Sequence, residues 1–267
     1  MLKQRVLTAA LLMPLVLGLL FLAPSSGFAV ALLPLIIVGA NEWYRLAGFK
    51  NRLAGALYVA FLAGCGALLY VSPSLYVPLL SLAGLWWLSL AVVVLAYPRL
   101  QPGWLLDGKA MLITGPLLLA TPWYAMLLLR SQPEGEWLVL LLLLLVWGAD
   151  IGAYFAGRRW GQAKLLPAVS PGKTVAGAVG GSLASIIIAA VAALIMEQPA
   201  SMIAYFLFVG FAVSWISILG DLAESLFKRR AGVKDSGTLL PGHGGVLDRI
   251  DSVTVAAPLF HLLVVGF

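Results

Sequence analysis

Two clusters of carboxylates near the C-terminus contain the residue types with the clearest chemical potential. Asp221 and Glu224 form the first cluster, Asp248 and Asp251 form the second, and the basic run 228–230 lies between them. Carboxylate oxygens are hard ligands that suit Mg²⁺, and cations neutralise the charge of phosphate groups. This combination suits the transfer of a nucleotidyl group from a triphosphate with release of pyrophosphate.

The spacing of the first cluster predicts a shared helix face. If 221–228 continue the apolar helix before them, residues at i, i+3, i+4 and i+7 line up, which places Asp221, Glu224, Ser225 and Lys228 together. Carboxylates at the end of a membrane helix must be paired or bound to a cation. A salt-bridge cluster between the carboxylates and 228–230 explains the pattern equally well.

Three glycines precede the second cluster, at Gly242, Gly244 and Gly245. They would let backbone N–H groups approach phosphate oxygens without an intervening Cβ. A flexible turn between two helices is the alternative.

A second polar region follows Asp150. Ser170 as an N-cap with Pro171 at the first helical position predicts a helix start, so the positive helix end would lie beside Lys173 and Thr174 and suit an anion. Lys173 could instead be an ordinary basic anchor at the membrane edge. This is no P-loop, because Pro167 occupies the position of the first glycine.

Two further carboxylates remain open between function and pairing. Asp150 binds metal or substrate, or pairs with Arg158 or Arg159. Glu42 is equally well explained by Arg45, one turn away. His261 stands alone on an apolar helix and is expected to be packed or hydrogen-bonded.

The elements that position these residues follow from composition. The 267 residues are 62% hydrophobic and 10% charged, with a mean hydropathy of +1.01, which is too apolar for a water-soluble globule. Backbone polar groups in lipid must be satisfied within each segment, so we expect an all-α, polytopic membrane helix bundle. About nine spans are predicted, at 6–23, 28–47, 53–71, 76–97, 110–129, 137–149, 177–196, 202–220 and 252–267. The first is interpreted as a retained helix.

Nine spans distribute the basic residues unevenly. Of the 17 Lys and Arg, 16 fall on one side, and only Arg130 falls on the other. This bias predicts a cytoplasmic N-terminus and places the polar regions 150–176 and 221–251 in cytoplasmic loops. The net charge of +6 is then a topology signal, and no nucleic-acid partner is indicated.

The run 225–251 resembles the signature of the phosphatidate cytidylyltransferase (CDP-diacylglycerol synthase) family. It matches that pattern at Ser225, Lys228, Arg229, Lys234, Asp235, His243, Gly244, Gly245, Asp248, Arg249 and Asp251. Many fixed polar residues in a short run make a specific signal. The N-terminal helices match only in hydropathy. The family also has an S-P-x-K-T stretch, but Ala176 stands where it often has an acidic or amide residue.

The resemblance implies an enzyme that makes CDP-diacylglycerol and pyrophosphate from CTP and phosphatidic acid in phospholipid biosynthesis. It implies Mg²⁺ held by Asp221 and Asp248, together with K⁺. The catalytic residues would be Asp221, Asp248, Lys228, Arg229 and Asp251. The substrate-binding residues would be Ser170, Lys173, Thr174, Ser225, Lys234, His243, Gly244, Gly245, Arg249 and Asp150.

The same resemblance implies a homodimer in a bacterial-type inner membrane, with membrane lipids around it and the active site facing the cytoplasm. The chain would be a single integral membrane domain, 1–267, with scaffold helices at 1–149, catalytic loops and helices at 150–251 and a final helix at 252–267. Two alternatives stay open. One is a CTP-dependent transferase acting on another lipid phosphate or a lipid alcohol, and the other is a transporter with charges in a cavity between helices.

Overall fold

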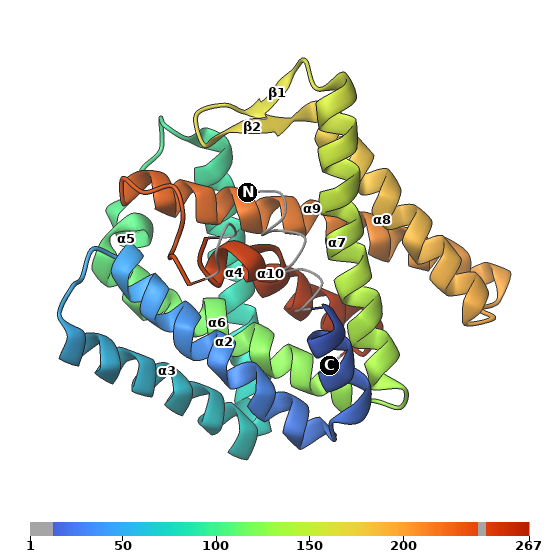
Figure 1. The fold of residues 1–267 in the computed structure, drawn as a ribbon, viewed down its shortest axis with the longest axis horizontal. Helices are drawn as coiled ribbons and strands as arrows, with labels where there is room; N and C mark the ends of the chain where they lie inside the picture. The colour runs from blue at the N-terminus through green and yellow to red at the C-terminus, as the bar shows by residue number, and fades with distance from the viewer. Residues whose placement is uncertain (1–12, 240–243, 267) are drawn as a thin grey trace.

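The computed structural model describes residues 13–239 and 244–266 (Figure 1). A short helix, Met13–Leu22, comes first. The remaining helices are α2 (Ser25–Leu46), α3 (Arg52–Val71), η1 (Pro73–Leu75), α4 (Tyr76–Ala96), α5 (Gly103–Leu106), α6 (Gly108–Ser131), α7 (Gly135–Trp160), α8 (Val175–Ile195), α9 (Ala200–Arg230) and α10 (Leu247–Val264). Two short antiparallel strands, β1 (Lys164–Leu166) and β2 (Ser170–Thr174), form a hairpin between α7 and α8.

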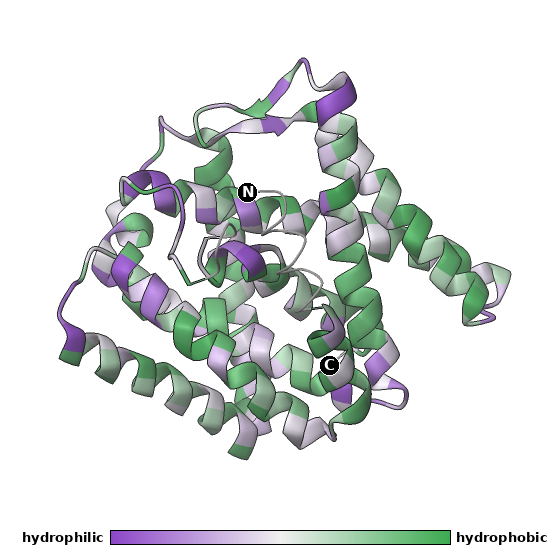
Figure 2. Cartoon of the chain, viewed as in Figure 1, coloured by the Kyte–Doolittle hydropathy of each residue, from purple (hydrophilic) through white to green (hydrophobic). Residues whose placement is uncertain are grey.

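The fold confirms the prediction of an all-α polytopic membrane bundle. Within the described residues, seven helices are long and apolar enough to cross a membrane: α2, α3, η1 with α4, α6, α7, α8 and α9. Hydrophilic residues gather at the hairpin, the end of α7 and the end of α9, while hydrophobic residues dominate most of the helices (Figure 2). Exposed apolar side chains such as Leu85 and Ile187 suit contact with lipid. Helix α10 covers part of the ninth predicted span, and the count of nine and the side of the N-terminus stay predictions.

Helix α6 lies at the centre of the bundle and is the most buried of the seven. It packs against α2 and α10 and also contacts α3, α4 and α7. Two cores flank it, one around Trp123, Leu142 and Phe260, the other around Trp43 and Phe227. The N-terminal half of the chain therefore supports the C-terminal helices directly.

Helices α7 and α8 pack closely because small residues face one another. A Cβ on Gly152 would lie 2.6 Å from the carbonyl oxygen of Gly180, and a Cβ on Gly181 would lie 2.6 Å from that of Ala149. Membrane helices associate largely through such close backbone contact, since lipid provides little hydrophobic drive between them. The two helices thereby hold the hairpin that joins them.

The structure corrects the prediction of a short span at 137–149 followed by a long loop. Helix α7 continues without a break to Trp160, so Asp150 and Arg158 lie on a helix. Close packing against α8 offsets the low helix propensity of Gly152 and Gly157, which the sequence pattern alone could not indicate.

The predicted helix start at Ser170 is also wrong. Ser170–Thr174 is strand β2, whose Ser170 pairs with Leu166 and whose Thr174 pairs with Lys164. The residue before a proline is biased toward extended backbone, which favours a strand at this point. Helix α8 begins at Val175, and the Thr174 hydroxyl accepts a hydrogen bond from the N–H of Gly177 at 3.0 Å.

Candidate active site

A polar cavity of about 460 Å³ lies where the ends of α7, α9 and α10 meet. Nine of the predicted site residues line it: Asp150, Asp221, Ser225, Lys228, Arg229, Lys234, Asp248, Arg249 and Asp251. The prediction that 221–228 continue the preceding helix is confirmed by α9, and Asp248 and Asp251 lie in the first turns of α10. Three separate helices thus bring four aspartates to one space.

Lys228 cross-links the two carboxylate clusters. Its Nζ lies 2.9 Å from Oε2 of Glu224, one turn earlier on α9, and 2.5 Å from Oδ1 of Asp248 on α10. All three side chains are largely buried. The salt-bridge alternative from the sequence is therefore correct for Glu224. It does not hold for Asp221, whose partner comes from another element.

Asp248 is held from several directions. Its Oδ2 accepts hydrogen bonds from the N–H of Ser236 at 2.8 Å, the Ser236 hydroxyl at 3.0 Å and the N–H of Gly245 at 2.7 Å. Partial burial opposes ionisation, but the hydrogen bonds from Lys228 and the two backbone N–H groups outweigh it and hold the pKa of Asp248 below its usual value. Asp248 precedes the predicted span 252–267 and stays ionised.

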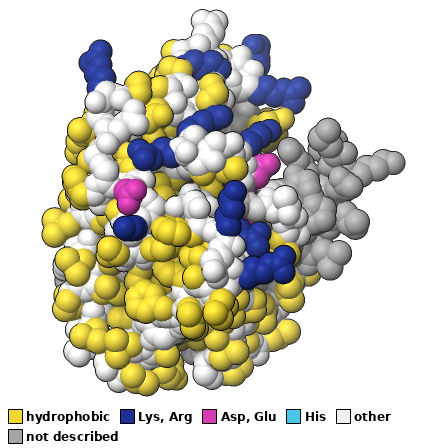
Figure 3. All heavy atoms as spheres, turned by 90° about the vertical axis from the view of Figure 1, so that its left-hand side faces the viewer, with side chains coloured by type: hydrophobic (Ala, Val, Ile, Leu, Met, Phe, Trp, Pro, Cys, Tyr) yellow, Lys and Arg dark blue, Asp and Glu magenta, His cyan; other side chains and the backbone are white. Residues whose placement is uncertain are grey.

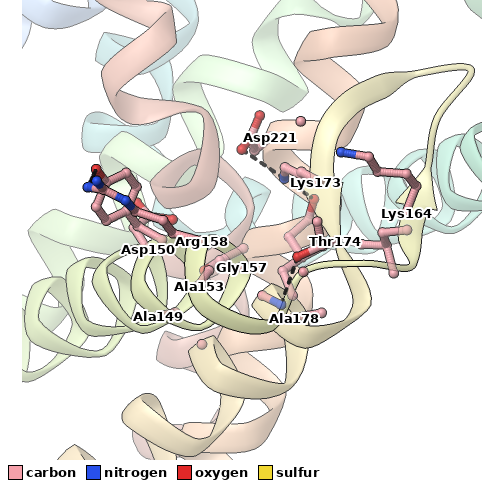
Figure 4. Close-up of a pocket in the computed structure, with 18 residues that line it drawn as sticks. Ala149, Asp150, Ala153, Gly157, Arg158, Lys164, Lys173, Thr174, Ala178 and Asp221 are labelled. Atoms are coloured by element: carbon pink, nitrogen blue, oxygen red, sulfur yellow. Dashed lines mark hydrogen bonds and ion pairs between the residues drawn. The ribbon is translucent and has the colours of Figure 1, made fainter.

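Asp221 is more accessible, with about a third of its side chain exposed. Its Oδ2 lies 2.7 Å from Nζ of Lys173 on β2, and its Oδ1 accepts from the Ser225 hydroxyl at 3.3 Å. Figure 4 shows Lys173 reaching from the hairpin toward Asp221. Lys173 therefore belongs to the site through a direct contact with a predicted metal ligand.

A second cavity of about 440 Å³ lies beside the first, between α7, the hairpin and α8, with Ser217, Ile218 and Asp221 of α9 along its edge (Figure 4). It shares Asp150 and Asp221 with the polar cavity and adds Lys164, Lys173 and Thr174. Ser170 lines neither cavity. Arg229 donates to the carbonyl oxygen of Val169 at 3.4 Å, which docks the hairpin on the end of α9.

Asp150 makes no ion pair with Arg158 or Arg159, so that alternative is wrong. Arg158 donates instead to the Tyr154 hydroxyl at 3.2 Å, and Arg159 lies over the ring of Trp160. Asp150 is left facing both cavities.

The predicted glycine turn lies only partly within the described residues. His243 and Gly242 fall outside them. Gly244 is described, with φ of +82°, a conformation that favours glycine. The N–H of Gly245 donates a hydrogen bond to Oδ2 of Asp248.

The sequence analysis missed Ser236 at this site and left the role of Glu42 open. Ser236 donates to Asp248, and Glu42 on α2 accepts from Ser236 and from the start of α10. Of the two alternatives left open for Glu42, pairing with Arg45 does not hold, because Glu42 forms no ion pair with it. The available signal for Glu42 was a carboxylate within an apolar run, which indicates a buried polar contact. The sequence could not identify its partners, because Val246 and Leu247 lie about 200 positions away in the chain.

The oxygen-rich cavity fits a divalent cation in the chemistry of its side chains. Asp150, Asp221, Asp248 and Asp251 are hard donors, and Mg²⁺ binds through one or two carboxylates plus substrate phosphates and water. Among the described residues no group of three or more His, Cys, Asp or Glu is preassembled around a single metal position. A metal site that includes the substrate's own phosphates as ligands agrees both with the carboxylate donors and with the lack of a preassembled group of three.

Fold and site together define a polytopic membrane protein with a polar, phosphate-compatible cavity at the ends of its helices. The model of one family, described as "Cytidylyltransferase family", matches residues 3–267, so this chain belongs to the cytidylyltransferase family. That membership favours an enzyme over a transporter.

Individual relatives agree with the family. The chain is 43% identical over 264 positions to a protein of Pseudomonas aeruginosa named phosphatidate cytidylyltransferase, with 98% of this chain and 97% of the relative covered. A protein of the same name from Haemophilus influenzae is 38% identical over 283 aligned positions, covering 97% of each. One from Staphylococcus saprophyticus is 44% identical over 140 positions, covering 52% of this chain and 54% of the relative.

Proposed function

We propose that this protein transfers the cytidylyl group of CTP to phosphatidic acid, giving CDP-diacylglycerol and pyrophosphate for phospholipid biosynthesis. The observation that carries the proposal is a polar cavity of aspartates and basic residues that adjoins an apolar cavity within one membrane bundle. One cavity suits a triphosphate and the other suits a lipid. Near-full-length identity to proteins named for this activity supports the same substrates.

The apolar cavity, of about 440 Å³, lies between the helix Met13–Leu22, α2, α6, α7 and α10. Its walls include Phe28, Trp123 and Leu143, and it reaches Asp150, Asp248 and Arg249. Acyl chains in this space would direct a lipid phosphate toward the polar cavity. We therefore propose that phosphatidic acid enters sideways from the bilayer.

The reaction places a phosphate oxygen of phosphatidic acid against the α-phosphorus of CTP. A phosphate monoester has its second pKa near about 6, so the nucleophile is already anionic near neutral pH and no general base is needed. Catalysis is then positioning and charge neutralisation by Lys173, Lys228, Arg229 and Arg249. Mg²⁺, held by Asp221 and Asp248 and accompanied by K⁺, would supply further neutralisation of phosphate charge.

The basic residues support an orientation with the site facing the cytoplasm. Lys and Arg side chains gather over the upper part of the face drawn in Figure 3, and hydrophobic side chains cover its lower part. Arg130 is instead paired with Glu136 at 3.2 Å, where α6 ends and α7 begins. From the positive-inside bias we propose that the cavity faces the cytoplasmic side of an inner membrane. A homodimer is proposed from the family resemblance alone.

The test is incorporation of radiolabelled CTP into lipid by the purified protein. Label should enter the lipid phase only when phosphatidic acid is supplied, and EDTA should stop it. The matched control replaces phosphatidic acid with diacylglycerol or with another lipid phosphate. Equal or faster incorporation into one of these acceptors would instead identify a related CTP-dependent transferase.

A further inference from the structure

Glu42 is a buried carboxylate in the N-terminal half of the chain, far in sequence from the motif residues. It is 4% exposed and accepts hydrogen bonds from the N–H groups of Val246 and Leu247 at 3.0 and 2.8 Å, and its Oε2 lies 3.1 Å from the Ser236 hydroxyl. Among the described residues it forms no ion pair. Its charge is compensated by the N–H groups at the start of α10.

Ser236 connects this carboxylate to the active site. Its Oγ lies 3.1 Å from Oε2 of Glu42 and 3.0 Å from Oδ2 of Asp248, so one hydroxyl group lies within hydrogen-bond distance of both carboxylates. The N–H of Asp248 approaches the same Oγ at 3.3 Å. The two acidic side chains therefore share one polar partner.

The segments around Glu42 pack closely against it. A Cβ on Gly245 would lie 2.5 and 2.6 Å from the two oxygens of Glu42, so backbone packs directly against the carboxylate. The neighbouring Trp43 donates a hydrogen bond to the carbonyl oxygen of Met111 at 2.7 Å. Its ring packs edge-to-face against that of Phe227, with the ring centroids 4.9 Å apart. Phe227 directly precedes Lys228, the partner of Asp248.

We infer that Glu42 is a positioning residue, which orients the Asp248 carboxylate in the polar cavity by holding Ser236 and the first residues of α10. This role rests on the proposed function, because Asp248 acts there. It gives helix α2, which lies within the region 1–149 predicted to be mainly scaffold, a direct part in the site. Glu42 itself touches no substrate and acts through Ser236, Val246 and Leu247.

The test compares E42Q, E42D and E42A with wild type in detergent or nanodiscs. E42Q keeps the volume but replaces one accepting oxygen by an NH₂ group that faces a donor, so we expect kcat to fall about tenfold with the KM for CTP within about twofold of wild type. E42D keeps the charge but shortens the reach and should lie between wild type and E42Q. E42A should show the largest fall in kcat.

Hydrogen exchange supplies a readout independent of turnover. Amide exchange across 244–250 should rise in E42Q and E42A, since the acceptor for the N–H groups of Val246 and Leu247 is weakened or removed. The matched control is R45A, which removes the exposed cation one turn away on the same helix and should leave kcat and exchange unchanged. Melting of each variant identifies any that fail to fold.

The outcomes separate the two proposals. If wild-type protein is inactive but exchange rises in folded E42Q, the proposed activity is rejected. The contact of Glu42 with the start of α10 is then still supported. Wild-type kcat in folded E42Q, or a fall in kcat without faster exchange across 244–250, would overturn the positioning role. A loss of kcat equally large in R45A would overturn it as well.

Discussion

Lys173 and Asp221 form an ion pair at 2.7 Å although they lie on different elements, strand β2 and helix α9. The contact brings the hairpin to the edge of the polar cavity. The ammonium group of Lys173 therefore lies beside Asp221 before any substrate binds.

Lys173 is predicted to bind the triphosphate of CTP. In K173A, loss of a charged hydrogen bond worth about 1.5–3 kcal/mol should lower kcat/KM by about 10- to 100-fold, mainly through a higher KM for CTP. Steady-state kinetics with varied CTP measure this. The control is G172A, whose added methyl group would meet no atom within 4 Å. An unchanged KM for CTP in K173A would contradict the assignment.

Asp221 and Asp248 are predicted to hold the metal ion. D221N and D248N should each lower magnesium-dependent turnover by about 100-fold or more, because the ion stabilises developing charge by several kcal/mol. Turnover as a function of Mg²⁺ concentration and melting in detergent are the two measurements. E136Q, in the first turn of α7 where Arg130 is its partner, controls for loss of a carboxylate elsewhere. Near-normal rates in either asparagine variant would remove the metal assignment.

Gly152 is predicted to be required for the contact between α7 and α8. In G152A the new Cβ would lie 2.6 Å from the carbonyl oxygen of Gly180 and 2.7 Å from Cβ of Ala184. Such overpacking costs about 1–3 kcal/mol, which exceeds the gain of about 1 kcal/mol in helix propensity. Thermal unfolding in detergent should show a lower midpoint. The control is G64A in α3, where a Cβ meets nothing within 4 Å, and it should not lower the midpoint. Equal midpoints for G152A and G64A would argue against the packing account.

The orientation of the chain can be tested with single cysteines. Cys65 is the only natural cysteine, so C65S provides a background for A168C in the exposed turn of the hairpin and S131C at the exposed end of α6. A membrane-impermeant thiol reagent added to intact cells should label S131C but not A168C. Inverted vesicles should reverse the pattern. Labelling of A168C in intact cells would overturn the cytoplasmic placement.

The amino-acid sequence by itself determined the class of fold and most of the site's chemical groups. Apolar length and charge distribution are local properties, and a helix in lipid must satisfy its own backbone, so membrane spans can be read along the chain. Helical spacing, which is also local, grouped the residues of 221–228 on one face, and the other motif residues up to Asp251 were found through their resemblance to the family signature.

Tertiary structure decided which of these groups meet. The sequence left Glu42 open between a functional role and pairing with Arg45. Its partners, Val246 and Leu247, could not be identified because they lie about 200 positions away and no periodicity records such a contact. The helix start at Ser170 failed because pairing with Leu166 favours a strand there. Packing between separate elements, and not propensity along each one, joins Lys173 on β2 to Asp221 on α9 and Glu42 on α2 to the start of α10.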